Sequence, residues 1–450
     1  MDVMQFMDAL LARAKEAGFE AAECYLSEGD SFQVGIHEGE IKSYDVSSSL
    51  GLGFRALIGG KVGYAATQAL DEAAIGQLID GARTNAQLID SPDTQFIHPG
   101  DAQYPELHAL DPALADVTAA EKIEKALLLE KTARALDSRV TQIDECALFT
   151  SRSQVRIVNT RGLDLRFEQG GAGMYVSAVA REGDEVNTGF KFRFARGFDE
   201  LDVQALAREA VDEACSGLGG APIASGSYRV ALDREAATSM LQTFASSFSA
   251  DAAQKGLSLL SGREGEQIAS DCVTLIDDPL YPDAFAGAPF DGEGVAARAK
   301  AIIDGGVLTT LLHNLKTAHK QGVPTTGNAA RGSYASQVSV APTNFFIKPG
   351  ARDRDALLKT LGDGLLITEL QGLHAGANAV SGAFSLSAKG FLIEGGRITR
   401  PVSGITAAGN FFELLRQVEE VGSDLWFSIP GTSCVGSPTL LVGTLKIAGR

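Results

Sequence analysis

The chain opens with apolar positions at helical spacing and continues with extended runs. One helix face is predicted in the first 18 residues by Val3, Phe6, Met7, Leu10, Leu11, Ala14 and Ala17. Extended runs separated by glycines follow, which predicts antiparallel hairpins. A closing helix is predicted with an apolar face made of Ala74, Ile75, Leu78, Ile79 and Ala82. Residues 1–90 are therefore expected to form an α+β module.

The same order of patterns recurs over residues 118–217. A helical pattern precedes further extended runs, and the apolar face of the closing helix is formed by Val203, Leu206, Ala207, Ala210, Val211 and Ala214. Two similar modules are the simplest interpretation, although any string of helix, hairpins and helix looks self-similar. Residues 91–117, between the modules, contain prolines and little periodicity, which indicates a linker or a long exposed loop.

Beyond residue 227 the pattern changes to short apolar runs interrupted by glycines. Such runs favour a twisted, mostly antiparallel β domain with a few helices over residues 227–450. The predicted fold class is α+β: two similar helix and antiparallel-strand modules followed by a glycine-rich, mostly antiparallel β domain.

Composition removes several classes of function. The formal net charge of −18 argues against nucleic-acid binding, which depends on clustered Lys and Arg. No apolar run approaches the length of a membrane-spanning helix, and the amino terminus lacks the pattern of a signal peptide. The five cysteines are widely spaced and include no C-x-x-C pair, so we expect a chain of the reducing cytoplasm.

Few residues have the spacing of a catalytic or metal site. His313 and His319 are six residues apart, which on a helix separates them by about 240° and makes them weak candidates as a ligand pair. His374 lies among glycines and is a third weak candidate. Ser387 and Lys389 would share one face of a strand, but no G-x-S-x-G or S-x-x-K motif supports a serine hydrolase.

Three stretches together are specific enough to indicate a family. They are "TTLLHNLKTAHKQGVPTTGNAAR" with the later "PTNFFIKPG", then "AVSGAFSLSAKGFLIEGGRITRPVSGITAAGNFFELLRQVEEVGSDL", and finally "GSPTLLVGTLKIAG". They resemble the TldD/PmbA family, and the three-part layout matches it over nearly the whole chain. The resemblance implies one of two branches: TldD, with an H-E-x-x-x-H zinc motif, or PmbA (TldE), which lacks it and pairs with TldD in a heterodimeric metalloprotease.

The stretch "EAATSMLQTFASSFSADAAQKGLS" distinguishes the branches. The resemblance places the motif's His, Glu and His at Leu241, Gln242 and Ser246, and none of these side chains is a usual zinc ligand or general base. Cys434 lies where the TldD branch supplies a cysteine ligand, and we interpret it as a structural thiol. The resemblance therefore implies that this chain holds no cofactor and that zinc belongs to a TldD-type partner.

These considerations identify the chain as a PmbA/TldE-type subunit without a complete catalytic site. It is expected to help a TldD-type partner cleave unfolded peptides, for instance through a sheet edge that captures peptide backbone. Two alternatives remain open: an independent hydrolase around His313, His319 and His374, and a regulatory binding protein of the kind implied by the family's label as a modulator of DNA gyrase. The sequence also leaves open whether the chain forms homodimers.

Overall fold

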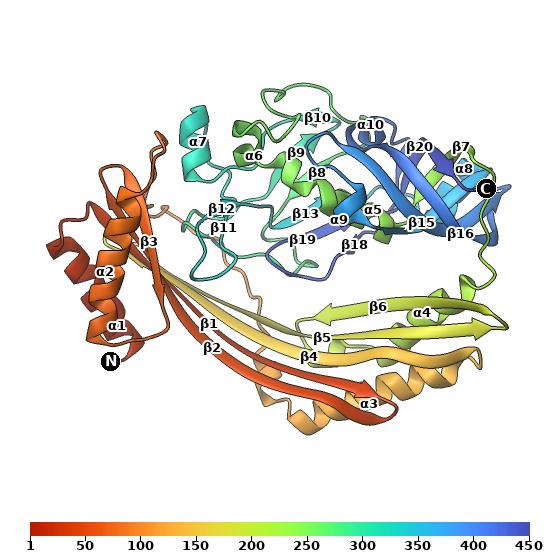
Figure 1. Cartoon of the computed structure of the whole chain (residues 1–450), viewed down its shortest axis with the longest axis horizontal. Coiled ribbons are helices and arrows are strands. Elements are labelled where there is room, and N and C mark those ends of the chain that lie inside the picture. The colour runs from red at the N-terminus through yellow and green to blue at the C-terminus, as the bar shows by residue number, and fades with distance from the viewer.

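The computed structural model describes all residues, 1–450, and Figure 1 shows a long curved sheet beneath a separate carboxy-terminal part. The first module contains α1 (Val3–Glu16), β1 (Ala21–His37), β2 (Glu40–Ile58), β3 (Lys61–Thr67) and α2 (Glu72–Gln87). The second contains α3 (Ala119–Leu136), β4 (Val140–Asn159), β5 (Asp164–Glu182), β6 (Glu185–Ala195) and α4 (Val203–Ser216). Short 3-10 helices lie at Pro112–Asp116 and Phe198–Glu200.

The two modules share one antiparallel sheet, in the order β3-β2-β1-β4-β5-β6. β1 pairs with β4 at the centre, where Gly29 lies opposite Ser153. Each module therefore has the order helix, three-stranded meander, helix, which confirms the predicted repeat of elements. The predicted apolar faces of α2 and α4 are also the buried faces.

The strands are longer than the sequence pattern predicted, because glycines lie inside them. The separation of extended runs by glycine is wrong at Gly29, because β1 runs through that position. Gly51 likewise lies inside β2. A Cβ atom at Gly51 would lie 2.1 Å from Tyr334 Cε1, and one at Gly53 would lie 2.1 Å from the Tyr334 carbonyl oxygen. Because these glycines have no side chain, a loop of the carboxy-terminal domain can pack directly against β2. They do not form a turn.

The sheet separates the helices from the carboxy-terminal domain. Side chains alternate between the two faces of a strand. Cys24, Leu26 and Val34 of β1 are buried in the clusters formed with the four helices. Tyr25 points the other way, and the Arg331 guanidinium of the carboxy-terminal domain lies 4.3 Å from its ring centre. The concave face is thus the one that meets the carboxy-terminal domain (Figure 1).

The segment between the modules, expected to be a linker or a long exposed loop, makes contacts with both parts of the chain. Residues 88–111 have almost no regular structure, yet Ile97 is only 1% exposed. The Tyr104 hydroxyl donates a 2.8 Å hydrogen bond to the Gly294 carbonyl. Buried apolar and hydrogen-bonding groups therefore hold this segment in place, and the sequence pattern had given no sign of them.

The carboxy-terminal domain begins after the Gly-rich segment that follows α4. Its elements are β7 (Gly226–Leu232), α5 (Arg234–Phe244), α6 (Ala250–Gln254), β8 (Leu275–Asp277), β9 (Lys300–Asp304), β10 (Val307–Leu308), α7 (Leu315–Gln321), β11 (Ala329–Ala330), β12 (Ser339–Val340), β13 (Asn344–Ile347), α8 (Arg354–Leu361), β14 (Gly364–Gln371), α9 (Leu373–Gly376), β15 (Ala383–Glu394), β16 (Arg397–Asn410), α10 (Phe411–Arg416), β17 (Glu420–Val421), β18 (Trp426–Phe427), β19 (Cys434–Ser437) and β20 (Leu440–Ala448). A 3-10 turn, Ala245–Phe248, continues α5.

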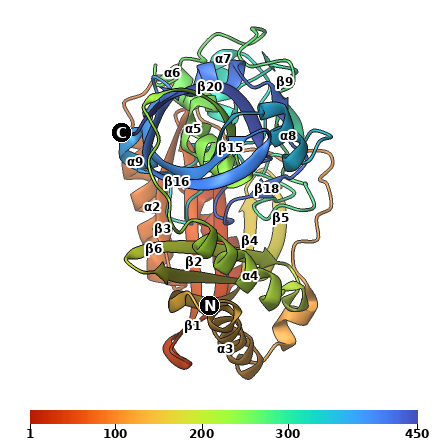
Figure 2. The ribbon, with the colours of Figure 1, turned by 90° about the vertical axis from the view of Figure 1, so that its right-hand side faces the viewer.

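Two six-stranded sheets organise this domain. One has the order β16-β15-β14-β7-β20-β17 and closes into a ring because β16 also pairs with β20 (Figure 2). The other has the order β10-β9-β8-β13-β19-β18. Only the pairs β7–β14 and β13–β19 are parallel, so the predicted mostly antiparallel β domain is confirmed. α5 packs against β7 and β14 of the ring and against β19 of the second sheet. No helix in the chain has both the length and the apolar character needed to cross a bilayer.

Candidate functional site

The helix α5 is fixed from both ends. The Asp233 carboxylate accepts a hydrogen bond from the Glu235 N–H and caps the helix start. Burial raises the pKa of Asp233, and the nearby Arg354 guanidinium opposes that shift. At the other end the Phe244 ring stacks on Phe411 with ring centres 4.5 Å apart. The apolar face of α5 is therefore packed in the core, and the helix cannot easily shift to move its side chains.

The three positions of the expected zinc motif carry no metal donor set. Leu241 is 1% exposed and belongs to the main apolar cluster of the domain. Gln242 and Ser246 are exposed on the other side of the helix and its 3-10 extension. Hydrocarbon, amide and hydroxyl groups do not replace the imidazole and carboxylate groups that zinc sites and their general bases use. The residues at this position do not fit a zinc ion.

Cys434 is also unsuited to ligation in this arrangement. Its neighbour Val435, not Cys434, is part of the apolar cluster that contains Leu241, and alternation along β19 places the thiol on the opposite side. The Cys434 Sγ lies 3.5 Å from the Ser428 carbonyl oxygen. Burial raises the pKa of this thiol to about 11, because a buried thiolate would lack the hydration that stabilises its charge.

The three candidate histidines lie in separate places. His313 is buried, and burial lowers the pKa of its imidazole. His319 is exposed on α7, where its ring lies 4.9 Å from the Phe96 ring. His374 is exposed on the short helix α9. Across the chain, no three His, Cys, Asp or Glu side chains converge in a way that could hold a metal ion.

The Ser387 and Lys389 pair likewise forms no catalytic dyad. Both residues lie on β15, but the Lys389 ammonium forms an ion pair of 3.3 Å with Glu369 on β14. No hydrogen bond joins Lys389 to Ser387, so the serine has no base that would activate its hydroxyl.

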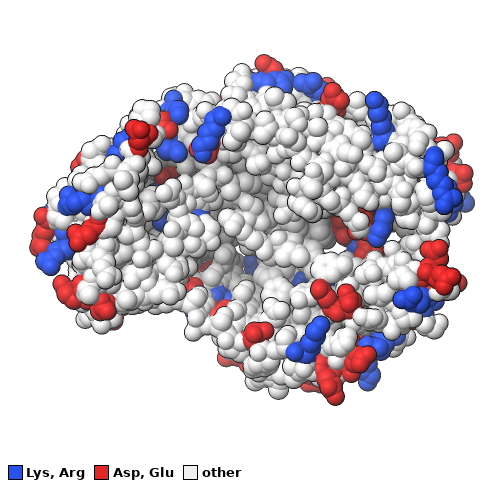
Figure 3. All heavy atoms as spheres, in the orientation of Figure 1, with Lys and Arg blue, Asp and Glu red and all other residues white.

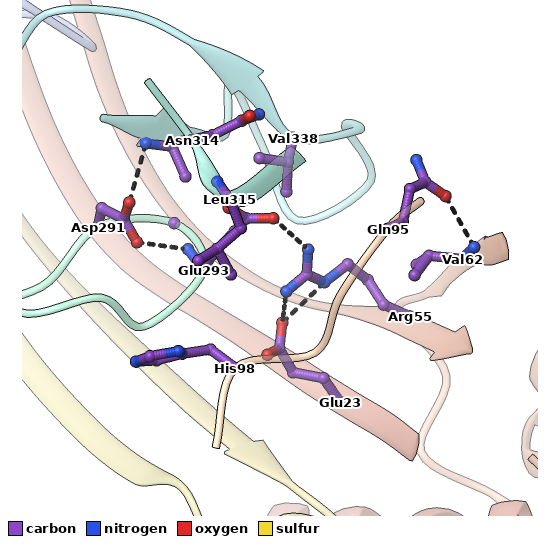
Figure 4. Close-up of polar contacts among 12 residues, drawn as sticks. Glu23, Arg55, Val62, Gln95, His98, Asp291, Glu293, Asn314, Leu315 and Val338 are labelled. Atoms are coloured by element: carbon purple, nitrogen blue, oxygen red, sulfur yellow. Dashed lines mark hydrogen bonds and ion pairs between the residues drawn. The ribbon is translucent and has the colours of Figure 1, made fainter. Parts of the chain in front are cut away.

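A buried ionic joint connects the first module to the carboxy-terminal domain. Glu23 Oε1 on β1 is 2.7 Å from a guanidinium nitrogen of Arg55 on β2 and 2.7 Å from one of Arg331. Arg55 also reaches Glu293 Oε1 at 3.3 Å, and Glu293 in turn accepts a hydrogen bond from the Leu315 N–H (Figure 4). All four charged side chains of this joint, Glu23, Arg55, Glu293 and Arg331, are buried, and the two members from the carboxy-terminal domain are Glu293 and Arg331. No sequence pattern indicated the joint, because its members are up to 308 residues apart.

The concave side of the sheet also carries a groove lined by aromatic rings. Between β6 and the carboxy-terminal domain lie adjoining cavities of about 430 Å³ and 200 Å³, which share Phe194 and Phe285. Figure 3 shows the surface hollowed between the sheet and the carboxy-terminal domain. The Phe192 ring lies 5.3 Å from the Trp426 ring, and the Phe194 ring lies 4.7 Å from the Phe285 ring. Because Gly171 on β5 has no side chain, the Phe194 ring can lie close over the sheet.

The start of β6 is lined by charged groups instead. A cavity of about 400 Å³ there contains Lys191, whose ammonium lies 2.8 Å from Glu213 and 2.7 Å from Glu235. Burial lowers the pKa of Lys191, but these two carboxylates outweigh burial and raise it. The charges at this end are therefore largely paired, and they join α4 and β6 to α5.

Comparison with known proteins identifies the family. The model of the PmbA/TldA metallopeptidase C-terminal domain matches residues 225–449, and the models of the central domain and domain 1 match residues 112–218 and 22–86. A "Metalloprotease" of Methanothermobacter thermautotrophicus is 31% identical over 325 residues, which cover 70% of this chain and 69% of the relative.

Two solved structures have the same fold over almost the whole chain. A proposed modulator of DNA gyrase from Thermotoga maritima has a TM-score of 0.91 and 32% identity, covering 99% of this chain and 100% of the other. TldE from Thermococcus kodakarensis has a TM-score of 0.89 and 25% identity, again covering 99% of this chain and 100% of the other. On the three family-model matches and these likenesses, the chain belongs to the PmbA/TldD metallopeptidase family.

Proposed function

We propose that this chain is the non-catalytic, PmbA/TldE-type subunit of a metalloprotease that acts on unfolded peptides. A TldD-type subunit of the same family would be its partner and would hold the zinc ion that activates water for attack on the peptide carbonyl. The chain itself would bind no cofactor, nucleic acid or membrane, and it would work in the reducing cytoplasm, in keeping with its five free thiols.

One observation supports this proposal most directly: at the family's motif position, helix α5 and its 3-10 extension have a buried apolar side chain and no side chain that is a usual zinc ligand. Leu241 fills the core, Gln242 and Ser246 offer only an amide and a hydroxyl, and Cys434 points away from the Leu241 cluster. A catalytic zinc site needs three protein ligands that converge with an open fourth position. Since the chain offers no such group of donors, its contribution to proteolysis would be peptide binding and positioning.

The test is reconstitution with a TldD-type partner. The chain purified alone should contain no stoichiometric zinc and show no chelator-sensitive peptidase activity, whereas the mixture should show both. A His→Ala change in the partner's motif should abolish cleavage, while Gln242→Ala in this chain should not. Zinc-dependent cleavage by this chain alone would favour an independent hydrolase. Stable recovery of a non-protease partner, with no TldD-type protein bound, would favour a regulatory binding protein.

A further inference from the structure

The cavity beside Phe192, Arg193 and Phe194 lies at a strand edge. These three residues are consecutive on β6, so their side chains alternate between the two faces of the sheet. All three nevertheless line the same cavity of about 430 Å³. Only a space at the open edge of the strand is reached from both faces, and β6 is the last strand of its sheet.

The opposite wall of this cavity is a second open edge. It includes Trp426 and Phe427 of β18, the last strand of the second sheet of the carboxy-terminal domain. β6 and β18 are not paired with each other. The cavity therefore separates the unpaired edges of two sheets, one from the central module and one from the carboxy-terminal domain.

Backbone groups on both edges point away from the strands with which β6 and β18 pair. The Phe190 N–H donates to the Glu213 side chain instead of to β5, and the register between β5 and β6 is unbroken. Backbone groups of an antiparallel strand point alternately to either side, so those of Phe192 and Phe194 also point away from β5. On β18, the Ser428 N–H donates to Val435, and therefore the adjacent Phe427 points its backbone groups outward.

We propose that this cavity binds an extended peptide, which adds to the edge of β6 as a strand. An extended segment satisfies outward N–H and C=O groups that a helix or a small apolar ligand leaves unpaired. Phe192, Phe194 and Trp426 then contact alternate side chains of the peptide, which favours aromatic or aliphatic residues at every second position. Backbone pairing makes the site tolerant of sequence otherwise, as a protease subunit for unfolded peptides requires. The inference rests on the proposed function and names the surface that would perform it.

Trp426 provides the readout, because it is the only tryptophan in the chain. The probe is the heptapeptide Lys-Thr-Phe-Thr-Phe-Thr-Lys, which contains no tryptophan, titrated into the full chain without a partner. We expect a saturable change in Trp426 fluorescence. Two further versions of the peptide carry N-methyl groups on alternate residues, one version on the odd-numbered and the other on the even-numbered positions. N-methylation removes the backbone donors on one side of the peptide strand. At least one of the two versions should therefore bind at least about tenfold more weakly than the unmethylated peptide. Equal binding of all three peptides, or binding seen by calorimetry without any change in Trp426 fluorescence, would overturn the proposal.

A matched pair of proline variants tests the strand assignment. Phe192→Pro removes an outward N–H of β6 and should weaken peptide binding at least about tenfold. Ala66→Pro lies at an exposed position of β3, the opposite edge of the same sheet, and should leave binding unchanged. Equal affinities for a folded Phe192→Pro variant and for Ala66→Pro would contradict the proposal. If Phe192→Pro does not fold, the methylated peptides decide the question on the unmodified chain. Zinc content and cleavage are measured separately, so loss of peptide binding would leave the non-catalytic assignment standing.

Discussion

Glu23→Gln should strongly destabilise the chain although the two side chains have nearly the same shape. The Glu23 carboxylate is completely buried and is the shared partner of Arg55 and Arg331. The substitution leaves two buried guanidinium groups, of which only that of Arg55 keeps a carboxylate partner, Glu293. Breaking a buried ion pair by removing one partner costs about 3–5 kcal/mol, since the remaining charge stays desolvated. That loss is a large fraction of the roughly 5–15 kcal/mol by which domains are stable.

Urea unfolding followed by circular dichroism measures this loss. The control is Glu419→Gln, which removes an ion pair with Arg229 whose side chains are 44% and 39% exposed, and it should change the free energy of unfolding by less than about 1 kcal/mol. A double-mutant cycle of Glu23→Gln with Arg331→Met should give a coupling energy of about 1 kcal/mol or more, because the two side chains are in contact. Losses that are equal for Glu23→Gln and Glu419→Gln would refute the role of the joint in docking the carboxy-terminal domain.

Three further substitutions test the helix and its surroundings. Leu241→Ala should lower the free energy of unfolding by about 2–5 kcal/mol, measured by urea unfolding, without abolishing cleavage by the reconstituted complex; complete loss of cleavage by a folded variant would show a catalytic role. Gly53→Ala should destabilise the chain because the new Cβ would meet the Tyr334 carbonyl oxygen; an unchanged melting temperature would contradict that contact. The pKa of Cys434 is raised from 9.0 to about 11, so the folded chain holds a proton that the unfolded chain releases in this window. The free energy of unfolding is unaffected by this thiol below pH 9 and falls by about 1.4 kcal/mol per pH unit between pH 9 and about 11. Cys434→Ala should remove that part of the slope in unfolding measurements made over this pH range.

Helix faces were predictable from the sequence because one buried stripe determines them. The apolar set predicted for α4, from Val203 to Ala214, is the set that the structure buries. Strand limits were less predictable because a glycine can either form a turn or lie inside a strand where another segment packs closely. The two cases look alike in a sequence. Gly39 has a positive φ of 79° in the β1–β2 turn, whereas Gly53 lies inside β2 against Tyr334. The distinction depends on a loop more than 270 residues further along the chain, which no local pattern reports.

The candidate site was predictable only in part, because contacts between distant segments leave no local sequence pattern. The absence of zinc ligands at Leu241, Gln242 and Ser246 could be read directly from the residue types. The placement of Cys434 depended on which face of a four-residue strand its thiol occupies. The ionic joint and the aromatic groove combine residues from distant segments, such as Glu23 with Arg331 and Phe192 with Trp426. Their charged and aromatic members have ordinary local sequence contexts, so only the assembled fold brings them together.

Zinc content and peptidase activity, measured on this chain alone and with a TldD-type partner, test the central claim most directly. The chain should be produced in a host that lacks any TldD-type protein. The account predicts no stoichiometric zinc and no chelator-sensitive cleavage for the chain alone, and both properties for the reconstituted complex, since the donors at Leu241, Gln242 and Ser246 are missing. Stoichiometric zinc together with robust chelator-sensitive cleavage by the chain alone would contradict it.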